Sequence, residues 1–343
     1  MDQDIITKRR IAFVLEYSEV KGDYPLERAI VLKELLSTEH VYMFLKSGAS
    51  QQYELFAQHQ IQPILFDKWR ELPKFLKDLE IDLLIFDGID STVEQVTMLR
   101  PFCQALIHFD DQGAGAGLVD CHIAALFEES TEMRAPNLLA GSYAFAISQP
   151  LLVATQQDKQ RSELPHIVIA YEDGDTENLT YRTLRHLTQL HIPLKISIVL
   201  DNNYKHPIED LQMMVLSRKN TTIYRQPNAL LSLLPTANIV ICNANYTPYK
   251  VATIGIPCIT AAQNERELNY SFFRESNGFV HLGLGRKMKQ SAIQNAVMEL
   301  LLHETRAERA IDLQQKHALI SNNEILQALL LDFAYARHHT VMG

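Results

Sequence analysis

Residues 237–269 constrain the fold of this chain more than any other stretch, because their polar side chains gather at turns between apolar runs. Residues 239–242 are short and β-branched, as is typical of a strand buried on both faces of a sheet. A proline suits the first turn of a helix over residues 247–254, and a glycine suits its end. A second buried strand follows at residues 257–260. The segment therefore predicts a strand, a helix and a second strand of a parallel sheet.

Polar residues occupy the turns of this unit, after its strands and before its helix. The carboxyl ends of parallel strands and the N-termini of the following helices lie at one edge of a sheet, where anions and sugar phosphates bind. We expect a small-molecule or sugar site there. Lys250 can only donate hydrogen bonds, so it contacts a phosphate, pairs with Glu265 or Glu267, or lies in water. The candidate binding residues are Asn243, Asn245, Thr247, Lys250, Asn264 and Glu265.

Strands and helices alternate along the chain in two rounds, which predicts an α/β fold with parallel sheets covered by helices. In the first round we expect strands at residues 11–15, 41–45, 63–66, 83–87, 105–109 and 122–127, with helices at 25–36, 51–59, 71–79 and 92–99. The second round has strands beginning at residues 166, 194 and 221 before the unit already described. Helices are expected at the end of the chain, over residues 290–302, 305–318 and 323–336.

Length and composition indicate two domains of ordinary size. The first is expected over residues 1–153 and the second over residues 166–320. Residues 154–165 are polar and without periodicity, so they are the predicted linker. Residues 321–343 carry a C-terminal helix, which we expect to return to the first domain.

A family resemblance rests on residues 237–269 and on residues 277–285, which read NGFVHLGLG. Both segments resemble the C-terminal half of the nucleotide-sugar hydrolases of pseudaminic acid synthesis and of the SpsG-type spore-coat polysaccharide proteins, within the GT-B group that includes MurG. Gly255, Pro257 and Cys258 match the family's Gly-x-Pro-Cys ending. Ala244 and Asn245 stand where the family has paired glycines, and Lys250 stands where it has a nucleotide-binding glutamate.

The N-terminal half resembles the same family. Gly22 and Arg28 match its Gly-x-Gly-His-x-x-Arg loop, but Tyr24 replaces the second glycine and Pro25 the catalytic histidine. The resemblance implies a GT-B-like fold, with two Rossmann-like domains whose parallel sheets face a central cleft. It also implies that Arg28 and the loop of residues 171–179 contact the substrate.

Residues 81–90 and 105–115 resemble the family's two acidic strands and keep Asp87, Asp110 and Asp111. Asp110 and Asp111 suit a sugar hydroxyl, a water or a divalent ion; alternatively, one of them caps the glycine-rich turn that follows.

In the loop of residues 171–179, Asp173 and Asp175 are candidate phosphate-loop residues; alternatively, this loop is a solvated helix N-terminus with ordinary caps.

A carboxylate must replace the missing histidine if the chain is a hydrolase. Asp23 is the leading candidate for the base, with Asp87 or Asp111 orienting the sugar. The alternative is that Asp23 only caps the helix that begins near Pro25. No metal-type spacing, P-loop or Ser-His-Asp order is visible, so we expect no cofactor and no metal.

Charge and hydropathy exclude two kinds of partner. The formal net charge is −9 and no basic run is present, which argues against nucleic acid. No apolar run approaches the ~18 residues of a membrane span. Four cysteines in apolar contexts and the absence of a secretion signal favour the cytoplasm.

Two classes of function follow from these features. The first is a surface-glycan protein of nonulosonic-acid or spore-coat type with altered or lost catalysis, serving as a binding subunit or as a partner of a glycan-pathway enzyme. The alternative is an active nucleotide-sugar hydrolase or glycosyltransferase with a base other than histidine.

Overall fold

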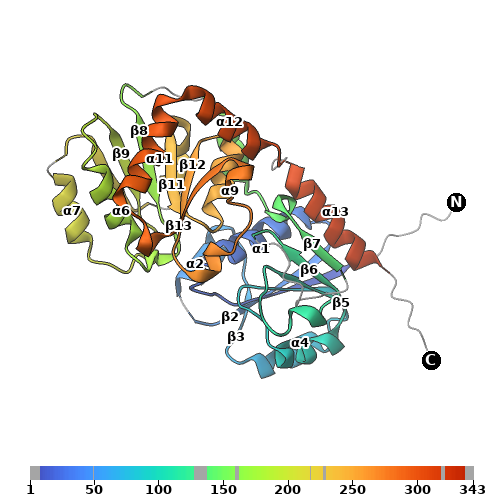
Figure 1. Ribbon diagram of the computed structural model, residues 1–343. Coiled ribbons are helices and arrows are strands. Elements are labelled where there is room, and N and C mark those ends of the chain that lie inside the picture. Colours follow the sequence, from blue (N-terminus) through green and yellow to red (C-terminus); the bar gives the residue numbers. More distant parts are fainter. Residues whose placement is uncertain are drawn as a thin grey trace. The chain divides into compact units, whose positions relative to one another are not determined.

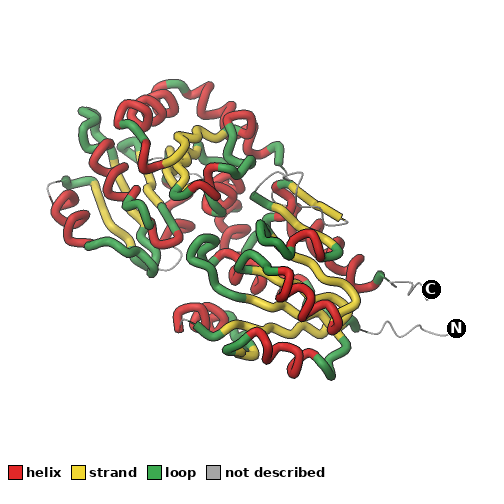
Figure 2. The backbone as a smooth tube through the Cα atoms, turned by 60° about the horizontal axis from the view of Figure 1, so that its bottom comes forward, coloured by secondary structure: helices red, strands yellow, loops and turns green. Residues whose placement is uncertain are grey.

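The computed structural model describes residues 8–48, 50–126, 137–158, 162–216, 218–226, 229–317 and 321–336. The chain forms two compact units (Figure 1). The first unit combines residues 1–146 with residues 321–343, and the second consists of residues 147–320. Each unit contains one parallel sheet with helices packed beside it (Figure 2), so the predicted α/β class is confirmed.

The first sheet has seven parallel strands in the order β3-β2-β1-β4-β5-β6-β7. From β1 the chain builds toward one edge and then crosses to the other side, so the strand order reverses between β1 and β4. The central strands β1, β4 and β5 are almost wholly apolar because helices cover both faces of the sheet. The strands are β1 (Arg10–Leu15), β2 (His40–Lys46), β3 (Ile64–Phe66), β4 (Ile81–Asp87), β5 (Cys103–Phe109), β6 (Cys121–Ala124) and β7 (Asn137–Ala140).

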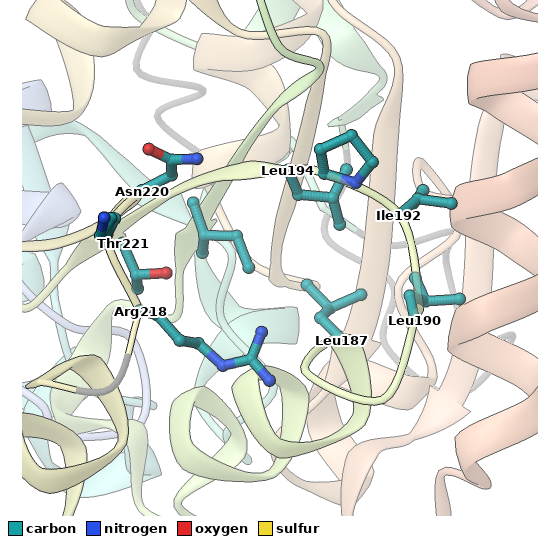
Figure 3. Close-up of a pocket in the computed structure, with 10 residues that line it drawn as sticks. Leu187, Leu190, Ile192, Leu194, Arg218, Asn220 and Thr221 are labelled. Carbon is teal, nitrogen blue, oxygen red and sulfur yellow. The ribbon is translucent and has the colours of Figure 1, made fainter.

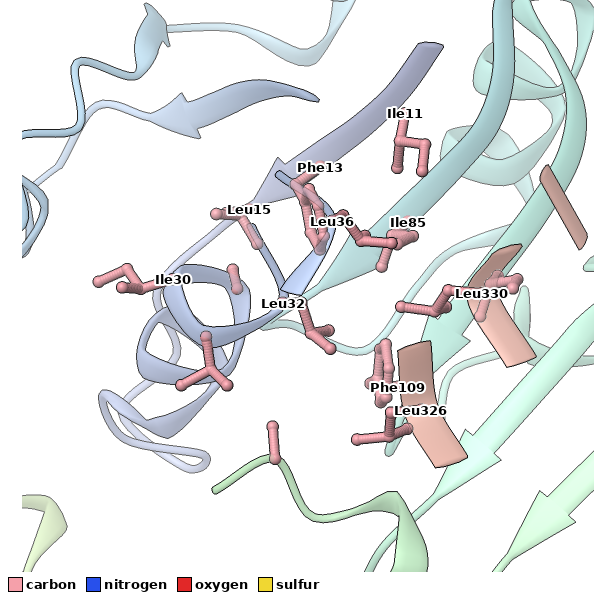
Figure 4. Close-up of a cluster of buried hydrophobic side chains, with 14 of the residues drawn as sticks. Ile11, Phe13, Leu15, Ile30, Leu32, Leu36, Ile85, Phe109, Leu326 and Leu330 are labelled. Atoms are coloured by element: carbon pink, nitrogen blue, oxygen red, sulfur yellow. The ribbon is translucent and has the colours of Figure 1, made fainter. Parts of the chain in front are cut away.

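The C-terminal helix α13 (Asn322–Tyr335) belongs to the core of the first unit. Leu326 and Leu330 are fully buried in the same cluster as Phe109 and Ile85, and Figure 4 shows these side chains together. The Asn322 side chain donates hydrogen bonds to the carbonyl oxygens of Ser142 and Phe145 and ties the start of the helix to this unit. The other helices of the unit are α1 (Tyr24–Leu35), α2 (Ser50–Gln58), α3 (Leu72–Leu76) and α4 (Val93–Leu99).

The second sheet has six parallel strands in the order β10-β9-β8-β11-β12-β13. Its order reverses between β8 and β11, whose residues pair in register from Ile167 with Ile239 to Ala170 with Cys242. The strands are β8 (His166–Ala170), β9 (Lys195–Val199), β10 (Thr221–Tyr224), β11 (Ile239–Asn243), β12 (Cys258–Ala262) and β13 (Phe279–Leu284). The helices are α5 (Gln149–Thr155), α6 (Leu179–Leu187), α7 (Ile208–Leu216), α8 (Ala229–Leu233), α9 (Thr247–Ile254), α10 (Glu265–Leu268), α11 (Gln290–Leu302) and α12 (Glu304–Gln315).

Sequence and structure differ at several boundaries. The chain divides after Ala146 rather than after residue 153, and α5 opens the second unit. Of the predicted linker 154–165, residues 154 and 155 end that helix and residues 159–161 lie outside the described residues. Strand β6 ends at Ala124, and Phe127, the predicted end, lies outside the described residues. So do residue 318, the predicted end of a helix, and residues 337–343 of the C-terminal segment.

All four cysteines are free thiols. Among the described helices, none has the length and apolar character that crossing a membrane requires.

Candidate functional site

The candidate site lies in the second unit, at the carboxyl edge of its sheet where the strand order reverses. Strand β8 ends at Ala170 and β11 ends at Asn243, and these two strands are neighbours. Asn243 is fully buried, and its Oδ1 accepts a hydrogen bond of 3.2 Å from the Glu172 N–H. The loops after the two strands are therefore joined at the place where open α/β sheets bind ligands.

Asp173 is the centre of the site. Its Oδ2 accepts hydrogen bonds from Asn243 Nδ2 at 3.1 Å and from Asn245 Nδ2 at 2.7 Å. Burial raises the pKa of Asp173 well above its ordinary value, and the neighbouring Glu172 and Glu267 carboxylates raise it further. We call Glu172, Asp173 and Glu267 the acidic cluster.

Glu172 lies against the first turn of α9. The Thr247 hydroxyl donates a hydrogen bond to Glu172 Oε2, and Lys250 Nζ lies 3.6 Å from the same oxygen. The Glu172 side chain is 27% exposed and that of Lys250 is 17% exposed, so the pair forms the rim of the site. A helix N-terminus attracts anions. Here the Glu172 carboxylate, not a bound anion, accepts from the Thr247 hydroxyl and pairs with the Lys250 ammonium group.

Glu267 is the buried member of the acidic cluster. Its Oε2 accepts from the Gln263 N–H at 2.7 Å and its Oε1 from Asn243 Nδ2 at 3.1 Å. The side chain is 1% exposed, and burial raises its pKa to about 7, although these hydrogen bonds oppose the rise. Asn264 positions this residue, because its side chain accepts a hydrogen bond from the Glu267 N–H and caps α10.

The loop after β8 has an unusual backbone. Asp173, Asp175 and Asn178 have φ values of 64°, 45° and 51°, and Gly174 has a φ of 79°. Such left-handed conformations cost energy in residues other than glycine and gather at functional sites. The Asp175 carboxylate accepts from the Leu179 and Thr180 N–H groups at 2.6 and 2.8 Å, so it caps α6. This capping agrees with the alternative interpretation of the loop as a capped helix N-terminus, although Asp175 is buried rather than solvated.

Glu265 lies outside the acidic cluster. Its side chain is 66% exposed and meets Arg286 at 3.3 Å. The structure thus brings five of the predicted binding residues together with Glu172 and Glu267: Asp173, Asn243, Asn245, Thr247 and Lys250.

The first unit contains a buried ion-pair network at the equivalent edge of its sheet. Arg28 on α1 is fully buried and bonds Asp87 through two nitrogens, at 2.8 and 2.9 Å. Its third nitrogen donates to Asp110 Oδ2 at 2.8 Å. Burial raises the pKa of Asp110, but Arg28 and Lys21 outweigh that effect and hold it below its ordinary value. Arg28, Asp87 and Asp110 therefore hold one another.

Asp111 is held separately from Asp110. Its Oδ2 lies 2.5 Å from both Ser91 Oγ and His108 Nδ1, and its Oδ1 accepts from the Gly113 N–H at 2.8 Å. Although burial opposes it, the hydrogen bonds from His108 and Ser91 hold the pKa of Asp111 below its ordinary value. Asp111 thus caps the glycine-rich turn, the second of its two readings. A side chain at Gly113 would lie 2.0 Å from the Ser91 carbonyl oxygen, so the turn requires glycine.

Asp23 stands just before α1 without a capping hydrogen bond from its side chain. The Asp23 side chain therefore does not play the alternative role of a helix cap, and its Oδ1 accepts from Gln52 Nε2 at 3.2 Å. Two residues before Asp23, the Lys21 side chain is 1% exposed, and its Nζ lies 3.4 Å from Asp90 Oδ1.

A small pocket of about 220 Å³ lies elsewhere in the second unit (Figure 3). It is lined by Leu187, Leu190 and Leu194 and by residues 218–221. Leu194 directly precedes β9, and residues 218–221 lead into β10. Because the strands are parallel, this pocket occupies the edge of the sheet opposite the acidic cluster. None of the predicted site residues lines it.

Sequence reasoning left Glu172 and Glu267 out of the site. Glu172 directly follows a predicted strand and lies in the same loop as Asp173 and Asp175, and this position is the signal that indicates a site residue. Glu267 stands three residues after Asn264, which is a capping-box spacing and indicates only a local role. Its contact with Asn243 depends on the pairing of β11 with β12, which the pattern of one segment does not reveal.

Comparison with known proteins identifies the fold. No family model matches the chain. Over 213 residues it is 22% identical to an uncharacterised protein of Methanocaldococcus jannaschii, a match that covers 57% of this chain and 43% of that protein. The chain thus spans less than half the length of that relative.

Solved structures match over nearly the whole chain. The MurG of Acinetobacter baumannii has a TM-score of 0.66 at 14% identity, covering 94% of this chain and 99% of that one. The UDP-GlcNAc 2-epimerase of Neisseria meningitidis, solved with UDP-GlcNAc bound, gives 0.61 at 12% identity, covering 94% and 100%. A glycosyltransferase of Rickettsia africae gives 0.63 at 11% identity, covering 96% and 100%. The chain therefore has the GT-B-like fold of these glycosyltransferases and epimerases.

Proposed function

We propose that this chain is a surface-glycan biosynthesis protein in which nucleotide-sugar turnover has been lost and a sugar site is retained. It is the sequence resemblance that points to nonulosonic-acid or spore-coat pathways. In such a pathway the chain serves as a sugar-binding subunit or as a partner of an active enzyme. The single observation that carries the loss of turnover is the contact of Glu172 with Thr247 and Lys250 at the first turn of α9.

Electrostatics support this proposal. A diphosphate at the first turn of α9 would lie beside the Glu172 carboxylate, which already accepts from Thr247 and pairs with Lys250. Two like charges about 4 Å apart repel by roughly 4 kcal/mol under the screening typical of a protein surface. A neutral sugar meets no such repulsion, because it carries no charge. Its hydroxyl groups also donate hydrogen bonds to carboxylates.

The first unit supports the same conclusion. Arg28 holds Asp87 through two hydrogen bonds, and Asp111 bonds Ser91 and His108. These carboxylates are committed to the protein's own side chains, and Pro25 stands where the resembling family has its histidine.

A turnover assay tests the proposal. The wild type is incubated with UDP-linked and CMP-linked N-acetylated sugars, and released sugar is measured beside a blank without protein. We expect no release above the blank. Release that falls by about 10² to 10⁴ in Asp23→Asn, but not in the exposed control Asp78→Asn, would establish the alternative of an active hydrolase with a carboxylate base.

A further inference from the structure

The open groups of the acidic cluster are hydrogen-bond acceptors. The bonds that Asp173 receives converge on Oδ2, which leaves Oδ1 for a ligand. Asn245 is 1% exposed, and its Oδ1 has no hydrogen-bond partner among the described residues, although its Nδ2 holds Asp173. A buried acceptor without a donor costs free energy. A ligand that satisfies this arrangement must bring donors.

The charges agree with the hydrogen bonds. The negative charges of Glu172 and Glu267 both act on Asp173, and Lys250 pairs with Glu172 at 3.6 Å. Asp201 adds a fourth carboxylate, which accepts from the Gly174 N–H at 2.9 Å. The cluster therefore attracts a cation and repels an anion.

A metal ion fits this arrangement poorly. In the described part of the chain, no three carboxylates, imidazoles or thiolates converge as metal ligands. An ammonium group needs only separate acceptors at hydrogen-bond distance, and a carboxylate beside amide oxygens provides them.

We infer that the acidic cluster binds a sugar that carries a free, protonated amine, with the ammonium group at Asp173 and Glu172 and a neighbouring hydroxyl on Asn245 Oδ1. The choice of a sugar rests on the proposed function, whereas the choice of an amine rests on the cluster itself. Glu172 and Asp173 are partly exposed, so the ammonium reaches them from solvent.

Three sugars that share one ring test the inference by calorimetry with the full chain. Glucosamine carries the amine, N-acetylglucosamine replaces its charge with an amide, and glucose has a hydroxyl there. We expect glucosamine to bind at least about tenfold more tightly than the other two, and its affinity to fall as salt is added, since the attraction is between charges. Equal affinities for the three sugars, or binding of none of them, would overturn the inference.

Asp173→Asn is the matched variant, because asparagine tolerates the positive φ of this position. It should lower glucosamine affinity about tenfold, whereas the exposed control Asp158→Asn should leave it unchanged. Should the variant fail to fold, the salt dependence and the ranking of the sugars on the wild type still decide the question. Micromolar UDP binding refutes the proposed function, whereas equal affinities of the wild type for the three sugars refute only the role of the amine.

Discussion

Lys250 stands where the resembling family has a nucleotide-binding glutamate, and Glu172 lies opposite it at the rim of the site. In the structure the two side chains pair with each other at 3.6 Å. The charges on both sides of the site thus satisfy one another, and a diphosphate has to displace Glu172 to reach Lys250.

Glu267→Gln tests the electrostatics of the site through the pH dependence of stability. The pKa of Glu267 rises from an ordinary 4.5 to about 7, so the folded state binds this proton more tightly than the unfolded state. Its contribution to the free energy of unfolding is fully present below pH 4.5 and is lost as the pH rises through 7. That loss amounts to about 3 kcal/mol at most.

Glutamine cannot ionise, so the variant should lose less stability between pH 5 and 7.5 than the wild type. Denaturant unfolding at a series of pH values measures this slope. The exposed control Glu209→Gln should keep the wild-type slope. Parallel pH profiles for the wild type and Glu267→Gln would show that Glu267 titrates as an ordinary carboxyl group.

Short-range patterns found part of this site and missed the rest for a physical reason. Asn243, Asn245 and Thr247 follow one strand directly, so the sequence placed them together, and they contact Asp173 or Glu172 in the structure. The contact of Glu267 with Asn243 joins helix α10 to the end of β11, and the two residues are 24 positions apart in the chain. Periodicity within one element carries no information on such a contact.

At the scale of elements, helix boundaries were predicted well where a proline marks the first turn and a glycine marks the end. Helix α9 spans Thr247–Ile254 as predicted, since Pro248 lies in its first turn and Gly255 ends it with a φ of 76°. Strand β7 has four residues, NLLA, and was missed because so short an apolar run does not distinguish a strand from a loop. Helix α5, which has seven residues, was also missed.

Helix α13 offers a test of packing within the first unit. Leu330 is fully buried in the core, and Ile325 on the same helix is 43% exposed. Leu330→Ala should lower the free energy of unfolding by about 2–5 kcal/mol, because it removes buried methyl groups and leaves a cavity. Ile325→Ala should cost less than about 1 kcal/mol. Denaturant unfolding of both variants measures the difference, and equal losses would contradict the placement of α13 in the core.

The whole molecule shares its fold with proteins whose sequences differ from it at most positions. At 14% identity or less, the chain matches the cited GT-B structures over at least 94% of its length. Buried strands require only apolar side chains of suitable size, so many sequences satisfy them. The loops after the strands and the first turns of the following helices face no such packing constraint, and here they carry Glu172, Asn245 and Lys250. The fold was therefore predictable from pattern, whereas the chemistry of the site required the contacts.

Calorimetric titration of UDP into the wild type and Glu172→Ala tests the central claim most directly. The wild type should bind UDP with a dissociation constant weaker than about 1 mM, because the Glu172 carboxylate contacts Thr247 and Lys250 at the first turn of α9 and repels the diphosphate. Removing the Glu172 carboxylate removes this repulsion and these two contacts, and it should tighten binding by about tenfold or more. A micromolar dissociation constant for the wild type, unchanged in the variant, would contradict the account.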